Sequence, residues 1–351
     1  MDQRQRAFLD DLLTTASPSG YETAGQRVWV DYVSEFADEV RTDDYGNAVA
    51  VVEGGDPTVA LAGHADEIGF IVKRIEEEGF LRIGPIGGAD RTVSKGQHVT
   101  VHADDPVEGV VGQTAIHLRD VGEEEYEDLE AQFVDIGVED ADAARELVDV
   151  GDPVTFSTTV AELQGTRVSA RGMDNRVGTW AAAEGLRAAA ESGVDATVCA
   201  VSTVQEEVGL QGAKMVGFDL DPDAAVAVDV THATDTPGVE SKRKTGVELG
   251  GGPVVTRGSS NHPVLVDLAR DAATAADVDV QLQAAGVRTG TDADAFYTSR
   301  GGIPALNLGI PNRYMHTPVE VVDTDDLDAT ATLLAAMADA AGGYDSFAVD
   351  V

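Results

Sequence analysis

Two adjacent carboxylates, Glu206 and Glu207, follow a short apolar segment in the middle of the chain. Residues 196–201 are rich in β-branched side chains and are bounded by polar residues, which indicates a buried strand of a parallel sheet. In an open α/β sheet, ligands bind beyond the carboxyl ends of the strands. The pair therefore stands where chemistry would occur, although an acidic chain can also carry such a pair in a solvated turn.

Four other potential ligands occupy similar positions, at the end of an apolar segment or at the start of a helix. They are His64, Asp174, Asp229 and His316. A single aspartate at a strand end is more often a turn former or a helix cap. However, strand ends converge on one rim of a parallel sheet even when they are far apart in the sequence. The conjunction of these residues with the glutamate pair favours one functional site over scattered turns.

Two imidazoles and three carboxylates, those of Asp174, Glu207 and Asp229, form a ligand set for borderline divalent metals. Zinc is the first expectation, and cobalt or manganese would also fit. If one carboxylate bridges, the set can hold two ions ~3.5–4 Å apart, as in cocatalytic hydrolases. Glu206 then remains as the general base for the attacking water. The pattern predicts a hydrolase with two divalent ions.

The motifs around these residues resemble those of the tetrahedral aminopeptidases, which are self-compartmentalising dinuclear metallopeptidases grouped with glutamyl aminopeptidases and endoglucanase-like proteins. The resembling segments are Gly63–Gly69, Met173–Arg176, Thr203–Leu210, Ala227–Thr231, Gly290–Ala293 and His316–Glu320. They occur in the family's order over nearly the whole chain. Asn175 departs from the more common second aspartate of an Asp-Asp-Arg motif, but the ligand position Asp174 is intact.

The resemblance implies a role for each residue. His64 and Asp229 would bind one metal and Glu207 and His316 the other, with Asp174 bridging. Glu206 would be the base, and Asp66 would fix the tautomer of His64 through a hydrogen bond. The reaction would be removal of N-terminal residues from peptides with a free N-terminus. The family also implies a homo-oligomer, in which an inserted domain makes dimer contacts and six dimers form a hollow dodecamer.

The elements that must position these residues alternate between strands and helices. We expect an α/β fold, with a central mixed sheet flanked by helices in a discontinuous catalytic domain of residues 1–70 and 166–351. Residues 71–165 consist of short β-rich pieces broken by Gly and Pro, which predicts an inserted small β-barrel. Within this insertion, the segment 119–129 is predicted to be a solvated loop.

The composition limits where the chain works and what it binds. It has 63 acidic and 24 basic residues in 351, a formal charge of -39. Such a surface repels nucleic acid and anionic lipid, and its self-repulsion is screened only where the Debye length falls to ~3 Å, near 1 M salt. We therefore expect a halophilic source. Without a signal peptide or a long apolar segment, we expect a cytoplasmic protein that spans no membrane.

Three other functions compete with the peptidase interpretation. A dinuclear amidohydrolase or deacylase acting on small N-acyl compounds would use the same ligands. A glycosidase is disfavoured, because adjacent strand residues such as Glu206 and Glu207 are expected to point to opposite faces and cannot flank a sugar. A non-catalytic scaffold is disfavoured because every predicted site position carries a competent residue. The preferred N-terminal residue, the native metal and the group that binds the substrate amine are not determined by the sequence.

Overall fold

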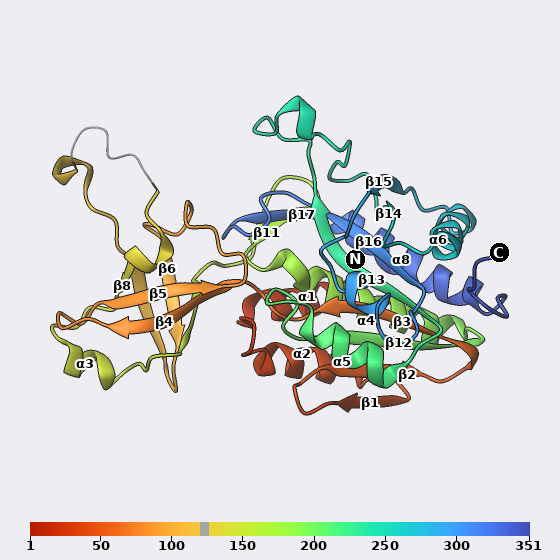
Figure 1. Cartoon of the computed structure of the whole chain (residues 1–351), viewed down its shortest axis with the longest axis horizontal. Coiled ribbons are helices and arrows are strands. Elements are labelled where there is room, and N and C mark those ends of the chain that lie inside the picture. Colours follow the sequence, from red (N-terminus) through yellow and green to blue (C-terminus); the bar gives the residue numbers. More distant parts are fainter. Residues whose placement is uncertain (120–125) are drawn as a thin grey trace.

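The computed structural model describes residues 1–119 and 126–351, so most of the predicted loop at 119–129 lies outside the described residues. The chain forms a large mixed sheet flanked by helices and a closed barrel that stands beside it (Figure 1). This arrangement confirms the predicted fold class. None of the described helices is long and apolar enough to cross a membrane.

The large sheet has eight strands. Their order across the sheet is β1 (Glu39–Thr42), β2 (Ala48–Val52), β12 (Ala196–Thr203), β3 (Gly55–His64), β13 (Ala224–His232), β16 (Ala305–Asn312), β14 (Val254–Gly258) and β15 (Gln281–Ala285). The four central strands, β12, β3, β13 and β16, run parallel to one another. Their carboxyl ends therefore share one rim, and Thr203 at the end of β12 lies opposite His64 at the end of β3.

Helices cover both faces of this sheet. They are α1 (Gln3–Thr14), α2 (Thr23–Val33), α4 (Met173–Ser192), α5 (Gln211–Leu220), α6 (Pro263–Ala275), α7 (Ala293–Phe296) and α8 (Thr324–Ala341). Because side chains alternate along a strand, Val198 packs with α1, α4 and α8, whereas Cys199 packs on the other face with α5 and α7. Cys199 is thus a buried core residue, as predicted.

The N-terminal helix shows how the sequence sets the element. Four residues at helical spacing, Phe8, Leu9, Leu12 and Leu13, are buried beside α2 and α4, and Asp2 forms a capping box with Gln5. The helix ends at Thr14. Pro18 follows shortly after, and a proline disfavours helical backbone at the residue before it, which agrees with a helix end in this region.

The barrel is a separate closed sheet. Its strands are, in order, β4 (Gly69–Ile75), β5 (Leu81–Ile86), β8 (Phe133–Asp135), β7 (Pro106–Val111), β6 (His98–His102) and β9 (Pro153–Phe156). They enclose their own apolar core, which includes Phe70, Leu81 and Val99. Among the described residues of this region, three short helices accompany the barrel: η1 (Ile116–Leu118), η2 (Leu129–Ala131) and α3 (Ala141–Arg145). The barrel is confirmed, while its predicted bounds at 71 and 165 stay a prediction.

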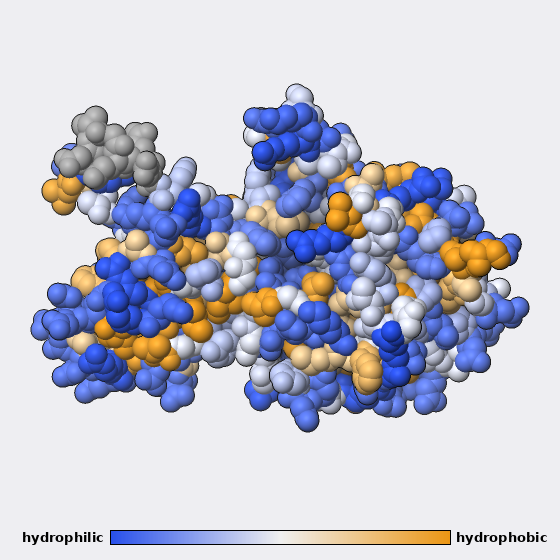
Figure 2. Space-filling model, viewed as in Figure 1, coloured by the Kyte–Doolittle hydropathy of each residue, from blue (hydrophilic) through white to orange (hydrophobic). Residues whose placement is uncertain are grey.

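Smaller elements complete the fold. A three-stranded sheet contains β10 (Ala161–Glu162), β11 (Arg167–Ala170) and β17 (Glu320–Asp323), and η3 (Ser241–Arg243) lies in the long connection after β13. In the space-filling view, hydrophilic residues cover most of the visible face and apolar residues gather on the barrel (Figure 2).

Candidate metal centre

His64 is the last residue of β3 and is almost completely buried. Its Nδ1 donates a hydrogen bond to the backbone carbonyl of Asp66 at 3.1 Å and lies 3.4 Å from Oδ1 of the same residue. This arrangement directs Nε2 toward three carboxylates on the rim of the sheet. A ring held in this way presents the Nε2 lone pair to a metal ion.

Asp174 lies between the two histidines. Its Oδ1 is 3.2 Å from Nε2 of His64, and its Oδ2 is 3.2 Å from Nε2 of His316. Asp174 belongs to the first turn of α4, where its backbone and that of Asn175 are not helical. This local departure from helix turns the carboxylate into the rim. One carboxylate with an oxygen toward each imidazole is the geometry that a bridging ligand requires.

Asn175, the departure from the family motif, supports this turn. Its side-chain Nδ2 donates to the backbone carbonyl of Val228 at 2.8 Å, and its Oδ1 accepts from the backbone N–H of Gly178 at 3.0 Å. An ionised aspartate has no donor for the carbonyl of Val228. The amide therefore suits a buried position between α4 and β13.

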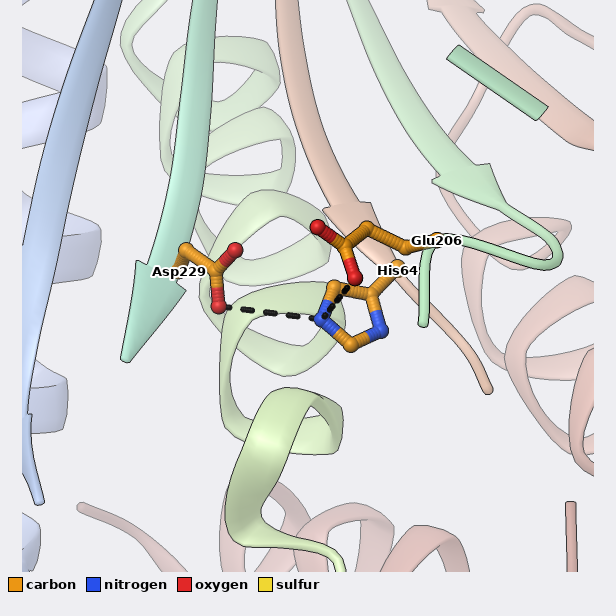
Figure 3. Close-up of side chains that lie close together, drawn as sticks. All are labelled: His64, Glu206 and Asp229. Carbon is orange, nitrogen blue, oxygen red and sulfur yellow. Dashed lines mark ion pairs between the residues drawn. The ribbon is translucent and has the colours of Figure 1, made fainter. Parts of the chain in front are cut away.

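The adjacent glutamates face two different parts of the centre. Oε2 of Glu206 is 3.9 Å from Nε2 of His64, which also lies 3.7 Å from Oδ1 of Asp229 (Figure 3). Oε1 of Glu207 is 3.4 Å from Nε2 of His316. The two residues follow β12 in a turn and do not continue the strand. The expectation that they point to opposite faces of a strand is therefore wrong, because both side chains enter the same site.

The ligand atoms fall into two groups, each with its atoms within 4.8 Å of one another. One group is His64, Glu206 and Asp229, and the other is Asp174, Glu207 and His316. All six predicted centre residues are thus brought together. The grouping differs from the predicted assignment in one respect, because Glu206 lies as close to the first histidine as a ligand would.

Asp66 holds His64 in place and also holds the turn that carries Glu206 and Glu207. Its Oδ1 accepts the backbone N–H of Glu206 at 2.9 Å, and its Oδ2 accepts that of Glu207 at 3.1 Å. The hydroxyl of Ser19 donates to Oδ2 at 2.7 Å. Asp66 therefore positions three site residues at once, whereas the sequence suggested a partner for His64 alone.

Two buried carboxyl groups contribute that sequence reasoning did not assign. Oε2 of Glu320 accepts the backbone N–H of Asp174 at 3.1 Å and the side-chain amide of Asn312 at 2.6 Å. Oδ2 of Asp292 accepts the hydroxyl of Thr203 at 2.5 Å. Burial raises the pKa of Asp292 to about 7. Both residues lie in segments that resemble family motifs. Their place in these motifs could have identified them as candidate site residues from the sequence.

His316 receives support from the barrel. Its Nδ1 donates to the backbone carbonyl of Gly88 at 3.2 Å, and Gly88 follows the barrel strand β5. A side chain at position 88 would meet the ring of His316, since an added Cβ would lie 2.8 Å from its atoms. The close approach of this backbone to the ring therefore depends on glycine.

The pKa shifts reflect acidic groups that are crowded together away from water. Burial raises the pKa of Glu206 to about 10, against the opposing effect of His64, and burial also raises the pKa values of Glu207 and Asp229. Hydrogen bonds to Asp174 and Glu207 raise the pKa of His316 to about 11. Carboxylates crowded out of water require compensating positive charge. Divalent ions fit this donor set, whose imidazole and carboxylate groups are ligands of zinc, cobalt and manganese.

The centre opens into a cavity of about 290 Å³ that is lined by the predicted ligands and by residues of β13, β14, β15 and β16. A larger cavity, of about 1000 Å³, lies at the opposite edge of the sheet, where Asp56, Asp223 and Pro304 mark the starts of parallel strands. The predicted residues all belong to the smaller cavity. The larger of the two cavities is therefore not the one that contains the predicted site residues.

The chain matches known proteins over nearly its whole length. The family model described as M42 glutamyl aminopeptidase matches residues 46–333. A lysyl aminopeptidase of Pyrococcus furiosus is 33% identical over 335 residues, which are 94% of this chain and 95% of that protein.

Solved structures agree with this match. The TET aminopeptidase of a marine sediment thaumarchaeon superimposes with a TM-score of 0.91 at 29% identity, covering 97% of this chain and 98% of that one. The TET1 peptidase of Pyrococcus horikoshii, which can assemble into a tetrahedron or a large octahedral shell, superimposes with a TM-score of 0.85 at 30% identity. That match covers 95% of this chain and 99% of the other.

Proposed function

We propose a two-metal reaction for this chain, which belongs to the M42 glutamyl aminopeptidase family and is a metal-dependent aminopeptidase. In the proposed reaction it removes N-terminal residues from peptides by hydrolysis. The observation that carries the proposal is the position of the Asp174 carboxylate. Its Oδ1 lies 3.2 Å from Nε2 of His64, and its Oδ2 lies 3.2 Å from Nε2 of His316. Such a carboxylate is placed to bridge two divalent ions.

The five ligands divide between two ions in this proposal. His64 and Asp229 hold the first ion, Glu207 and His316 hold the second, and Asp174 is shared. Zinc is the preferred metal, with cobalt or manganese as substitutes, because the set combines imidazole with carboxylate. When bound, the two ions polarise the scissile carbonyl and make water a stronger acid.

Glu206 is the proposed general base. Its carboxylate is buried beside the ligands, and among the described residues only the imidazole of His64, 3.9 Å away, forms an ion pair with it. It therefore has a free oxygen to take a proton from the attacking water and transfer it to the leaving amine. Asp66 contributes by holding the backbone of Glu206 and the ring of His64 in place.

The substrate is proposed to carry a free N-terminus, because the carboxylates of the rim favour a positively charged amine. Peptide reporters and their N-acetylated forms should be compared on the metal-loaded enzyme. We expect cleavage of the free forms and loss of at least ~10-fold in kcat/KM on acetylation, which removes the charge. Comparable rates on both would contradict an aminopeptidase, and preferred turnover of N-acyl amino acids would instead support the alternative of a small-molecule deacylase.

The larger assembly and the setting are also part of the proposal. Residues 71–165 are proposed to form an inserted dimerisation domain, since the barrel exposes Val110, Leu147 and Val150 on its surface. Dimers would then assemble into a dodecamer that encloses the sites. The tetrahedron or shell formed by the Pyrococcus horikoshii relative supports an assembly of this type. The charge of -39 supports a halophilic cytoplasm.

A further inference from the structure

The cavity beside the metal centre has a wall without charge. Apart from the ligands and His232, the side chains that line it are neutral. The polar ones are Thr231, Thr256, Gln283, Thr289, Thr291 and Asn307. Within the part of the chain that the structure describes, no arginine or lysine lines this cavity.

This wall comes from the strands on the far side of the ligands. Thr256 of β14 and Asn307 of β16 are both buried and joined by a hydrogen bond of 3.3 Å, and the hydroxyl of Thr231 donates to Gln283 at 2.7 Å. Oδ1 of Asn307 is buried and accepts no hydrogen bond in the described structure. These side chains give the cavity a wall of neutral hydrogen-bonding groups next to the predicted ligands.

We propose, on the basis of the function proposed above, that this cavity receives the N-terminal side chain and selects uncharged residues. An acidic side chain would enter a cavity that already contains four carboxylates and would find no guanidinium or ammonium group to pair with. Two divalent ions would at most neutralise the four negative charges, so the cavity would have no net positive charge to bind an acidic side chain. Burial of an unpaired carboxylate is costly, so acidic residues are excluded.

Basic side chains meet a different limit. The wall offers amide and hydroxyl oxygens but no carboxylate outside the ligand set, so a lysine or arginine head group would lose water without gaining an ionic partner. At low salt, the overall charge of -39 would attract such substrates from a distance. At molar salt this attraction is screened, and the local wall decides the preference. This chain therefore differs in substrate from what the names lysyl and glutamyl aminopeptidase describe.

A panel of aminoacyl reporters at molar salt tests the proposal. We expect kcat/KM for leucyl, methionyl and glutaminyl reporters to exceed kcat/KM for glutamyl and aspartyl reporters by about 100-fold or more. The same neutral reporters should exceed lysyl and arginyl reporters by about 10-fold. Unpaired polar groups in a binding site discriminate between substrates on this scale. Calorimetry of the free amino acids adds a reading independent of turnover, and leucine should bind where glutamate does not. A preference for acidic or basic reporters would overturn the proposal.

Matched variants place a cation on the wall and outside it. Gln283→Lys should raise the glutamyl-to-leucyl ratio of kcat/KM by about 10-fold or more, because it supplies the missing partner. Thr289→Lys places the same charge on another part of the wall. Ala284→Lys is the control, since Ala284 lies on the same strand but points to the opposite face and should leave the ratio unchanged.

The outcomes separate the two levels of the proposal. An unchanged ratio in both wall variants, with leucyl turnover retained, would show that this cavity does not meet the substrate side chain. A gain of glutamyl turnover in Ala284→Lys equal to that in Gln283→Lys would do the same. Absence of turnover on every reporter would overturn the aminopeptidase reaction itself, and this inference with it.

Discussion

Each imidazole of the centre is held through its Nδ1 atom. His64 donates from Nδ1 to the backbone carbonyl of Asp66, and His316 donates from Nδ1 to that of Gly88. A carbonyl oxygen accepts only from a protonated nitrogen, so in the neutral form that can bind a metal each ring keeps its proton on Nδ1 and offers Nε2 as the ligand atom. The tautomer that a metal requires is therefore built into the backbone on both sides of Asp174.

Replacement of the proposed base separates catalysis from metal binding. Glu206→Gln keeps the size of the side chain but cannot accept a proton, so kcat should fall by ~10³ while both metals stay bound, in the range of a positioned general base. Steady-state kinetics beside metal analysis of the purified protein measures the two quantities.

Asp229→Ala is the matched comparison, because it removes a proposed ligand from the same half of the centre. It should lose about one metal equivalent per chain together with activity, since each proposed ion depends on few protein ligands. If Glu206→Gln loses a metal equivalent in the same way, Glu206 is a ligand as its distance to His64 allows, and another group must act as the base. Activity within ~10-fold of the wild type would also remove it from that role.

At the scale of elements, the centre depends on the close approach of α4 to β3. Gly63, one residue before His64, packs against the backbone of Gly178 in α4, and an added Cβ on Gly63 would lie 2.5 Å from that backbone. The absence of a side chain at Gly63 lets α4 lie close enough to β3 for Asp174 to come within 3.2 Å of His64. The bridging position is thus set by helix-to-sheet packing as much as by the ligand itself.

Substitution at this contact should affect both stability and metal binding. Gly63→Ala forces α4 away from β3, because backbone atoms cannot move aside as a flexible side chain can. We expect a loss of about 1–3 kcal/mol in the free energy of unfolding and weaker metal binding. Gly301→Ala is the control, because nothing lies within 4 Å of a Cβ added there. Equal effects of the two substitutions in chemical denaturation would contradict the importance of the close approach.

A buried ion cluster ties three elements together behind the centre. Glu67, which follows β3, forms ion pairs with Arg171, just after β11, and with Arg176 in α4. Burial alone would raise the pKa of Glu67, but the two guanidinium groups outweigh it and lower the pKa to about 2. The unfolded pKa lies near 4.5, so the stabilisation is present above that pH and is lost as the pH falls through about 2.

The acid dependence of this cluster can be measured by comparison with Glu67→Gln. The variant leaves two buried guanidinium groups without their carboxylate and should be less stable than the wild type at neutral pH. On acidification from about 4.5 toward about 2, the difference in unfolding free energy should shrink by about 3 kcal/mol, since each pKa unit corresponds to 1.36 kcal/mol. A difference that stays constant over this interval would show that protonation of Glu67 does not control acid stability.

For the whole molecule, the charge of -39 should make assembly more sensitive to salt than folding. Packing several such chains together multiplies repulsion across each interface, while the apolar core holds each chain. Below ~0.1 M salt the Debye length is ~10 Å or more, so opposing charges are no longer screened. We therefore expect the proposed assembly to dissociate before the chain unfolds as salt is lowered.

Light scattering after size exclusion, run beside far-ultraviolet circular dichroism over a salt series, determines this order. A large particle that persists at low salt would show that apolar contacts dominate the interfaces. Loss of circular dichroism before dissociation would show that the fold itself is the salt-sensitive part. Either result would replace electrostatic repulsion as the controlling force.

The sequence predicted the residues of the centre better than their supports. Proposed ligands such as His64 and Asp229 could be picked out because they lie at or near the ends of apolar strands, and strand ends share a rim. Glu320 and Gly88 could not, because each acts through a backbone contact across a long separation in sequence, and no periodicity reports such contacts. The side-chain directions of Glu206 and Glu207 were also missed, since they depend on where β12 ends and its turn begins.

The contact between the barrel and His316 links two regions that fold around separate cores. Because the carbonyl of Gly88 holds the ring of a proposed ligand, a change in how the barrel sits on the α/β unit must move or release that ring. Thermodynamic linkage is reciprocal. If a protein that binds the barrel changes the metal affinity of the centre by some factor, then metal binding changes the affinity of the barrel for that protein by the same factor. The barrel is therefore in a position to act as a sensor of metal occupancy as well as a point of attachment.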